Sequence, residues 1–323
     1  MGSALIIGVS GQDGRLLARL LLDREYAVRG WIRREPAAPA PCECALIDIL
    51  QPALVEAELR RSTPDEIYYL AAFHHATEDV IELSAAELLR RSFDVHVLGL
   101  LSVLQAMEEC CPRTRLFYAA SSHVFGTPES EWQNEETPLT PNSAYGVSKA
   151  AGLQCCQLYR RQKGIFAATG ILFNHESPWR QPSFLSQKIV RGALRAQRDP
   201  TYKLMLGDLE ARVDWGYAPD YVEAMFRILQ LPEASDFVVA SGEMHTVREF
   251  AQAAFGALNL DWRRHVETDT HLLNKISHPL QGDSCKLRAA TGWAPTIDFV
   301  EMVMRLVHDA EEPSSRCASA LRP

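Results

Sequence analysis

The chain has 323 residues, of which 47% are hydrophobic and 23% charged, the balance of an ordinary folded domain rather than of a disordered chain. Its net charge of -8 at pH 7 argues against a broad nucleic-acid-binding surface, so an anionic ligand would need a local cationic pocket. No apolar run reaches membrane-spanning length and the first residues lack the layout of a signal peptide, so we expect a cytoplasmic protein with no nucleic-acid or membrane partner.

Short apolar runs alternate with helical patterns through the first half of the chain. In chain order, the patterns predict a strand at 4–10, a helix at 14–25, strands at 27–34 and 44–50, a helix at 52–62, a strand at 65–72, a helix at 85–109, a strand at 114–122, a helix at 144–162 and a strand at 165–173. Strands and helices that alternate in this way form right-handed βαβ units. We therefore predict an α/β fold with a Rossmann-type doubly wound parallel sheet.

The regular alternation fades in the second half of the chain, where loops and isolated helices surround a predicted strand at 236–241 and a predicted helix at 246–258. Residues 1–173 are expected to form a dinucleotide-binding Rossmann domain. Residues 174–310 are expected to form mainly a smaller substrate-binding lobe, partly interleaved with the first domain and covering the strand ends where ligands of such folds bind. Residues 311–323 lack an apolar period and are predicted to be a disordered tail.

A glycine-rich loop, GVSGQDG, connects the first predicted strand to the first predicted helix. Gly8, Gly11 and Gly14 in this position permit a tight turn and the close approach of a pyrophosphate to the helix N-terminus, whose free N–H groups favour negative charge. This context predicts a dinucleotide site, with a purely structural turn as the alternative.

Two arginines at the end of the second predicted strand bear on which dinucleotide binds. An NAD site usually has an acidic residue there for the ribose hydroxyls, whereas this chain has Arg33 and Arg34. A guanidinium group suits the 2′-phosphate of NADP, so we predict NADP, with solvated surface arginines as the alternative. Asp48, which ends the third strand, is predicted to contact the adenine.

The segment YGVSK places Tyr145 and Lys149 one helical turn apart, on the same helix face. An ammonium group at this spacing is expected to lower the pKa of the phenol and to bind the cofactor ribose, which would make the tyrosine a working acid–base. Ser121 and Ser122 end the preceding strand, where a hydroxyl can share the substrate's oxygen with the phenol. The glycine loop, the serine and the tyrosine–lysine pair follow one another as in short-chain dehydrogenases/reductases.

Longer segments resemble the GDP-mannose 4,6-dehydratase family more closely. They are GVSGQDG, GILFNHESPWR at 170–180, DWGYAPDYVEAM at 214–225 and HTVREFAQAAF at 245–255. The resemblance covers residues 4 to about 307 and implies a nucleotide-sugar substrate, GDP-linked mannose or heptose, together with NADP.

The resemblance also implies roles for individual residues. The implied cofactor contacts are Gly8, Gly11, Gln12, Asp13, Gly14, Arg33, Arg34, Asp48, Leu70, Ala71, Ala72, Lys149, His175 and Arg180. Ser122 and Asn174 are the predicted substrate contacts. Tyr145 would draw the proton of the C4 hydroxyl, Lys149 would orient the ribose and the phenol, and Ser121 stands where the family has a catalytic threonine.

The implied reaction is an internal redox cycle. Hydride leaves C4 of the hexose, and the resulting ketone acidifies the C5 proton. A base removes that proton, water leaves from C6, and the hydride returns to C6. Removing a proton next to a carbonyl places the developing charge on an oxygen that the tyrosine and the serine can stabilise.

His123 departs from the family at the position of the glutamate that removes the C5 proton. Imidazole can do acid–base work near neutral pH, since its unperturbed pKa is about 6.5. Three interpretations are open: His123 replaces the glutamate in a working dehydratase, the chain is a 4-keto-sugar reductase or epimerase, or His123 is an ordinary polar residue in an altered or inactive relative. The presence of Ser121, Tyr145 and Lys149 argues against the last.

Two further departures concern the nucleotide and the oligomer. Residues 273–283, LNKISHPLQGD, lack the arginine and glutamate with which the family meets the diphosphate and ribose, which weakens GDP as the carrier. The loop after Arg34 is shorter than the family's tetramer-building loop, so we expect a homodimer through two long helices, with a tetramer as the alternative.

No metal site is expected. The eight cysteines include no CxxC pair and no zinc-type spacing, and free thiols in a reducing cytoplasm account for them. The adjacent His74 and His75 have no third ligand at a suitable spacing.

Overall fold

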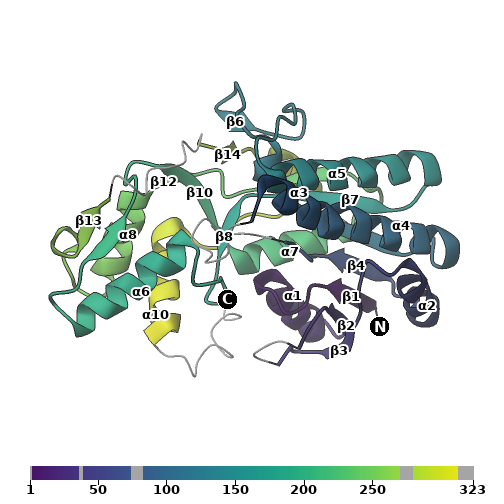
Figure 1. Cartoon of the computed structure of the whole chain (residues 1–323), viewed down its shortest axis with the longest axis horizontal. Helices are drawn as coiled ribbons and strands as arrows, with labels where there is room; N and C mark the ends of the chain where they lie inside the picture. The colour runs from purple at the N-terminus through teal and green to yellow at the C-terminus, as the bar shows by residue number, and fades with distance from the viewer. Residues whose placement is uncertain (1, 36–38, 74–82, 270–278, 312–323) are drawn as a thin grey trace.

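The computed structural model in Figure 1 describes the whole chain except residues 1, 36–38, 74–82, 270–278 and 312–323. A seven-stranded parallel sheet lies at its centre, in the order β11-β7-β5-β4-β1-β2-β3. Its strands are β1 (Ser3–Ile7), β2 (Ala27–Ile32), β3 (Glu43–Leu46), β4 (Glu66–Tyr69), β5 (Arg115–Ser121), β7 (Ala167–Leu172) and β11 (Asp236–Val239). The order runs outward in both directions from β1 and β4, so the predicted doubly wound sheet is confirmed.

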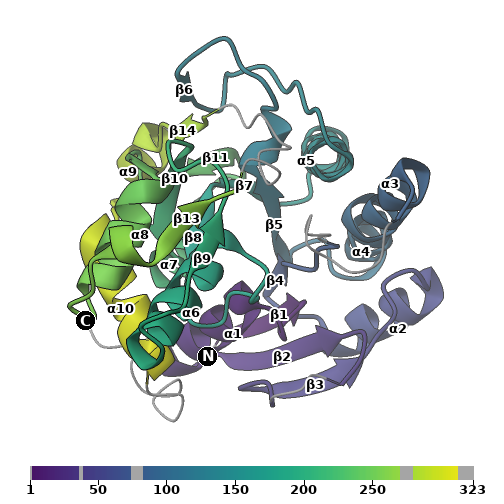
Figure 2. The same ribbon diagram turned by 60° about the vertical axis from the view of Figure 1, so that its left-hand side comes forward.

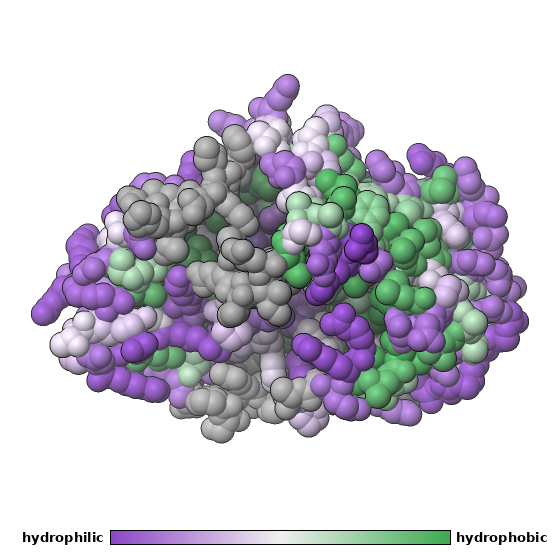
Figure 3. Space-filling view, in the orientation of Figure 1, coloured by the Kyte–Doolittle hydropathy of each residue, from purple (hydrophilic) through white to green (hydrophobic). Residues whose placement is uncertain are grey.

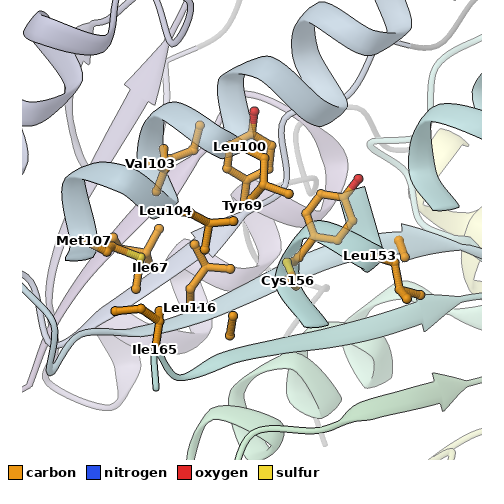
Figure 4. Close-up of a cluster of buried hydrophobic side chains, with 14 of the residues drawn as sticks. Ile67, Tyr69, Leu100, Val103, Leu104, Met107, Leu116, Leu153, Cys156 and Ile165 are labelled. Atoms are coloured by element: carbon orange, nitrogen blue, oxygen red, sulfur yellow. The ribbon is translucent and has the colours of Figure 1, made fainter. Parts of the chain in front are cut away.

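Helices cover both faces of this sheet (Figure 2). One face carries α1 (Gln12–Asp23), α7 (Ala218–Leu229) and α9 (Cys285–Thr291), and the other carries α2 (Pro52–Ser62), α3 (Ala85–Phe93), α4 (Gly99–Cys110) and α5 (Ala144–Lys163). The strands are apolar on both sides because both faces are buried. Figure 4 shows the core on the second face, where sheet residues meet α4 and α5: Ile67, Tyr69, Leu116, Leu100, Val103, Leu104, Met107, Leu153, Cys156 and Ile165.

A smaller lobe has its own buried core, formed around α6 (Leu185–Arg198), α8 (Val247–Gly256) and α10 (Phe299–Glu311). Three short sheets accompany it: β12 (Met244–Thr246) with β10 (Arg212–Tyr217) and β8 (Asn174–Glu176), β13 (Val266–Thr268) with β9 (Leu204–Leu206), and β14 (Gln281–Gly282) with β6 (Trp132–Gln133). The sequence patterns predicted none of these short strands. The predicted strand at 236–241 instead joins the large sheet as β11, beside β7.

Two predicted elements differ from the structure in extent. The third strand ends at Leu46 because Asp48 accepts a hydrogen bond from the Leu50 amide and turns the chain before α2. The predicted helix at 85–109 is continuous but contains a π-helical turn, Asp94–Leu98, between α3 and α4.

The domain boundaries at 173 and 310 stay predictions, and the predicted tail lies outside the described residues apart from Glu311. No helix in the described part of the chain is long and apolar enough to cross a membrane. The described cysteines are free thiols, and among the described residues no group of three potential metal ligands was found.

Candidate active site

The glycine loop lies at the carboxyl edge of the large sheet, between β1 and α1. Gly8 has a φ of 93°, and a Cβ there would lie 2.8 Å from the Ala71 nitrogen, so the turn and the neighbouring strand end both require glycine. A Cβ on Gly14 would lie 2.5 Å from the Gly8 carbonyl oxygen. Gly11 is different, because it is exposed and its Cβ would meet only the Gly8 oxygen, at 3.4 Å.

Gly11 is also the N-cap of α1, which has no side-chain cap. The first N–H groups of the helix therefore receive no hydrogen bond from an N-cap side chain, and such groups can bind a pyrophosphate. The structure thus fits the predicted dinucleotide cradle. Leu70, Ala71 and Ala72 follow β4 beside it, and the Leu70 amide donates to Ile7 at the end of β1.

A hydrogen-bonded network joins the start of α1 to the segment after β8. His175 Nδ1 lies 2.7 Å from the Phe173 oxygen and Nε2 lies 3.0 Å from Asp13 Oδ1. Both ring nitrogens therefore lie within hydrogen-bond distance of an oxygen, which fixes the orientation of the ring. Burial raises the pKa of Asp13, but the charge and hydrogen bond of His175, the hydrogen bond of Gln12 and the charge of Arg180 together lower it to about 2.

Gln12 completes this network. Its Nε2 donates to the His175 carbonyl oxygen at 3.1 Å, and its Oε1 accepts from Ser177 Oγ at 2.8 Å. Gln12, Asp13 and His175 are therefore brought together beside the glycine loop, as their predicted cofactor role requires, and that role stays a prediction.

Tyr145 and Lys149 lie on the first turns of α5, next to the end of β5. Lys149 is almost fully buried, and its Nζ donates to the Ala119 oxygen at 2.7 Å and lies 5.7 Å from the centre of the Tyr145 ring. Burial lowers the pKa of Lys149 to about 7, against a smaller opposing effect of Asp13. The predicted one-turn spacing thus places a weakly basic amine beside the phenol.

The structure does not support the prediction that Lys149 lowers the pKa of Tyr145, because Lys149 is not among the groups that shift this pKa. Burial raises the pKa of Tyr145 to about 12, and among the effects that lower it the charge of Arg180 is the largest, followed by the hydrogen bond with Ser121. Lys149 contributes little because burial leaves its amine only partly charged near neutral pH.

Arg180, a predicted cofactor contact, follows β8 in the chain. Its Cζ is 3.8 Å from the centre of the Phe184 ring, and its Nε is 3.6 Å from Glu176 Oε2. That Nε is buried and has no hydrogen-bond partner among the described residues. A cation held in this way can meet an anionic or hydroxyl group of a ligand.

His123 lies in a 3-10 turn, Ser122–Val124, directly after β5. Its amide lies 3.3 Å from Ser121 Oγ, which accepts its hydrogen bond. The imidazole is exposed and meets the Tyr145 ring edge-on, with ring centres 5.7 Å apart. A Cβ on Gly146 would lie 2.5 Å from the His123 oxygen, so the glycine at the start of α5 allows this close contact. The structure therefore brings His123 beside Tyr145 and Ser121.

The remaining predicted residues lie around this centre. Arg33 and Arg34 are exposed directly after β2, and Asp48 is exposed, with its carboxylate bonded within its own turn. Ser122 is buried beside Ser121, and Asn174 is half-buried at the start of β8. His74, His75 and residues 273–278 lie outside the described residues.

The sequence analysis did not single out His96. This histidine is fully buried in the π-helical turn, and its ring meets the Tyr145 ring edge-on at 5.2 Å between centres. The only available signal was one histidine in an otherwise apolar helical run, VHVLGLL, which more often marks an ordinary core histidine.

The buried amine of Lys149 predicts a pH dependence of stability in the cofactor-free protein. Its pKa falls from 10.5 to about 7 on folding, so between these values the unfolded chain binds the extra proton and stability rises with pH. Between about pH 7 and pH 9, wild type should gain about 2 kcal/mol more unfolding free energy than Lys149→Met. Urea unfolding measures both proteins, and parallel pH profiles would contradict the assignment.

The family described as GDP-mannose 4,6 dehydratase matches residues 5–306. GDP-mannose 4,6 dehydratase 2 of Arabidopsis thaliana is 38% identical over 334 residues, covering 97% of this chain and 88% of that protein. The structure of dTDP-glucose 4,6-dehydratase from Bacillus anthracis in complex with NAD gives a TM-score of 0.83 at 19% identity, covering 98% of each chain. RMD from Pseudomonas aeruginosa complexed with NADPH gives 0.80 at 23% identity, covering 96% of this chain and 99% of that one.

Proposed function

Because this chain belongs to the GDP-mannose 4,6-dehydratase family, we propose that it is an NADP-dependent 4,6-dehydratase acting on a GDP-linked mannose or heptose. The observation that carries the proposal is the grouping of Ser121, Tyr145 and His123 at one strand end, beside a dinucleotide cradle. Its product would be a 4-keto-6-deoxy sugar. A cytoplasmic location stays a prediction.

Support for the cofactor comes from the glycine loop and from the two exposed arginines after β2. Solved structures of the same fold bind NAD in one case and NADPH in another. NADP, when bound, supplies the hydride acceptor for C4 and the hydride donor for C6. The free N–H groups of α1 would hold its pyrophosphate, and Arg33 or Arg34 its 2′-phosphate.

Tyr145 would take the proton of the C4 hydroxyl. Burial raises the pKa of this phenol to about 12, and the charge of Arg180 and the hydrogen bond with Ser121 oppose that rise, which makes the phenol a stronger acid than burial alone would leave it. The hydroxyl groups of Tyr145 and Ser121 can then donate hydrogen bonds to the C4 oxygen of the 4-keto intermediate. Negative charge develops on this oxygen when C5 loses its proton. Lys149, with a pKa of about 7, can exchange the proton near neutral pH.

His123 would be the base at C5. Its neutral imidazole accepts the C5 proton and, as the imidazolium, donates it to the C6 hydroxyl, which leaves as water. The exposed position of the ring next to Tyr145 supports this role, because a sugar bound over Tyr145 would lie within its reach.

The replacement of the family's glutamate by His123 also favours a second candidate, a 4-keto-sugar reductase or epimerase. Such an enzyme would keep the redox residues and use His123 only as a proton carrier, without loss of water.

A single incubation distinguishes the two candidates. Purified protein is mixed with GDP-mannose or a GDP-heptose and NADP, without NADPH, and products are identified by mass spectrometry. We expect a 4-keto-6-deoxy sugar. Absence of this product, with consumption of NADPH when a 4-keto sugar is offered, would reject the dehydratase and support the reductase.

The arginines after β2 predict a cofactor preference that binding can measure. Arg33→Ala/Arg34→Ala should weaken NADP binding by about 10- to 100-fold, the loss expected for charge-assisted hydrogen bonds, and leave NAD binding unchanged. Arg29→Ala on β2, whose guanidinium instead pairs with Glu43, is the matched control. Equal loss of NAD and NADP affinity would show that the arginines do not read the 2′-phosphate.

We also propose a homodimer through the layer of α3, α4 and α5. Exposed apolar side chains lie on this layer, namely Leu89, Leu98, Val147 and Leu158, and hydrophobic residues gather on its visible side (Figure 3). Burying such a patch against a second copy is favourable. A tetramer is the alternative.

Light scattering of two variants tests the interface. Leu89→Asp/Leu158→Asp should shift the protein from dimer to monomer, while Leu22→Asp, which changes an equally exposed leucine on α1, should not. A dimer that survives the double substitution would place the interface elsewhere.

A further inference from the structure

The π-helical turn between α3 and α4 is held by the sheet below it. The Tyr69 hydroxyl, from β4, donates to the Val95 oxygen, and the Tyr118 hydroxyl, from β5, donates to the His96 oxygen at 3.3 Å. These two bonds supply partners for carbonyl groups at a place where the regular helical ladder is interrupted. The turn is therefore built into the fold by residues of two neighbouring strands.

Helix α5 approaches this turn closely because of one glycine. A Cβ on Gly152 would lie 2.2 Å from the Tyr118 hydroxyl and 2.7 Å from the His96 oxygen, so a side chain there would push α5 away. The catalytic helix and the π-helical turn are consequently in direct contact.

The His96 side chain links two parts of the active site. Its Nε2 lies 3.0 Å from the Phe73 amide, which can only donate, so Nε2 accepts. Its Nδ1 lies 2.8 Å from Ser148 Oγ and therefore carries the proton and donates. The Ser148 hydroxyl in turn donates to the Tyr145 carbonyl oxygen at 2.9 Å. This chain of bonds fixes the neutral Nδ1–H tautomer.

The bonds of His96 connect the cofactor side of the site to the catalytic helix. Phe73 directly follows residues 70–72, the predicted cofactor-lining end of β4, whereas Ser148 and Tyr145 belong to α5. The imidazole also meets the Tyr145 ring edge-on, with an interplanar angle of 89°. One side chain thus contacts the ring, the helix turn and the strand end that surround the phenol.

We propose that His96 is a positioning residue. Through its bonds to Ser148 and Phe73 and the contact of its own ring, it holds the Tyr145 phenol at a fixed position and orientation relative to the cofactor. The inference deepens the proposed function, since it assigns Tyr145 the acid–base role stated there. It needs no contact between His96 and the substrate. Small displacements of an aligned acid–base group reduce turnover strongly, by about 100-fold for 1 Å.

Three substitutions separate the bonds of His96. His96→Ala removes both and should lower kcat by about 10- to 100-fold with little change in KM for the sugar. His96→Asn places an amide near the Nδ1 position, so it can keep the bond to Ser148 and should recover part of kcat. His96→Gln can keep the bond to Phe73 but not the bond to Ser148, so its kcat should stay low.

His265→Ala is the matched control, because His265 is also a buried histidine, bonded to the Tyr202 oxygen and stacked on Phe255 in the small lobe. It should lower the unfolding temperature and leave kcat per folded molecule unchanged. A kcat within twofold of wild type in His96→Ala would overturn the proposal, as would equal kcat in His96→Asn and His96→Ala.

A readout that does not depend on turnover distinguishes failure of this inference from failure of the proposed function. Hydrogen exchange of the Phe73 amide, followed by mass spectrometry, should be faster in His96→Ala and His96→Asn and unchanged in His96→Gln. NADPH affinity, measured by fluorescence, should fall in the first two variants. If the wild type makes no dehydrated product, the Phe73 exchange rate and the NADPH affinity still test the positioning role of His96. Wild-type values of both in His96→Ala would contradict that role.

Discussion

Tyr145→Phe is expected to lower kcat by about 10³-fold, the largest effect of any single substitution in the site. The variant keeps the ring that His96 and His123 contact but loses the hydroxyl that takes the C4 proton. Ser121, which shares a hydrogen bond with this phenol, is a far weaker acid and cannot replace it. Turnover at saturating substrate measures the loss, and NADPH fluorescence should show an unchanged cofactor affinity.

Tyr159→Phe is the matched control for this experiment. Tyr159 also lies on α5 and packs against the same core, but it is distant in sequence from the first turns that carry Tyr145. Its kcat should equal that of wild type. A Tyr145→Phe enzyme with kcat within tenfold of wild type would show that another group takes the C4 proton.

His123→Ala is expected to stop elimination while sparing cofactor binding. Without a base at C5 the reaction should end after oxidation at C4, so a 4-keto sugar and NADPH should appear in one turnover, and the 4-keto-6-deoxy product should fall by at least about 100-fold. The exposed position of His123 makes a large loss of stability unexpected. His308→Ala, on the exposed side of α10, is the control.

His123→Glu tests whether a carboxylate in this place restores elimination. The proposed role predicts recovery of product from the alanine variant, because both groups can take a proton at this point. Full turnover in His123→Ala would instead show that His123 is not the base. If the wild type, His123→Ala and His123→Glu all reduce a 4-keto sugar at equal rates and none forms the dehydrated product, the reductase is the correct assignment.

Local patterns were sufficient to predict the large sheet and the residues at its carboxyl edge. The glycine loop and the YGVSK spacing act within one turn or one helix, so the sequence alone places Gly11 at a helix N-terminus and Tyr145 beside Lys149. The short strands of the small lobe could not be predicted in this way. Strands such as β8 and β13 have three residues each, too few for a periodic pattern, and they exist because distant segments pair with them.

Protonation could not be predicted from spacing either. The Tyr/Lys pattern predicted a phenol with a lowered pKa, yet burial raises the pKa of Tyr145, and the charge that opposes this most belongs to Arg180, 35 residues away in sequence (180 − 145). Desolvation depends on everything packed around a group. It therefore becomes visible only in the folded chain.

The sequence by itself determined the fold class and predicted the dinucleotide loop and the acid–base residues, because each of these inferences rests on residues that are close together in the chain. The tertiary structure alone decided that His123 lies beside Tyr145 and that His96 supports the same ring from a π-helical turn. Tyr69 and Tyr118, on two parallel strands, donate hydrogen bonds to carbonyl groups of that turn, and Gly152 lets α5 come close to it. Such contacts join residues far apart in sequence, so no local pattern records them.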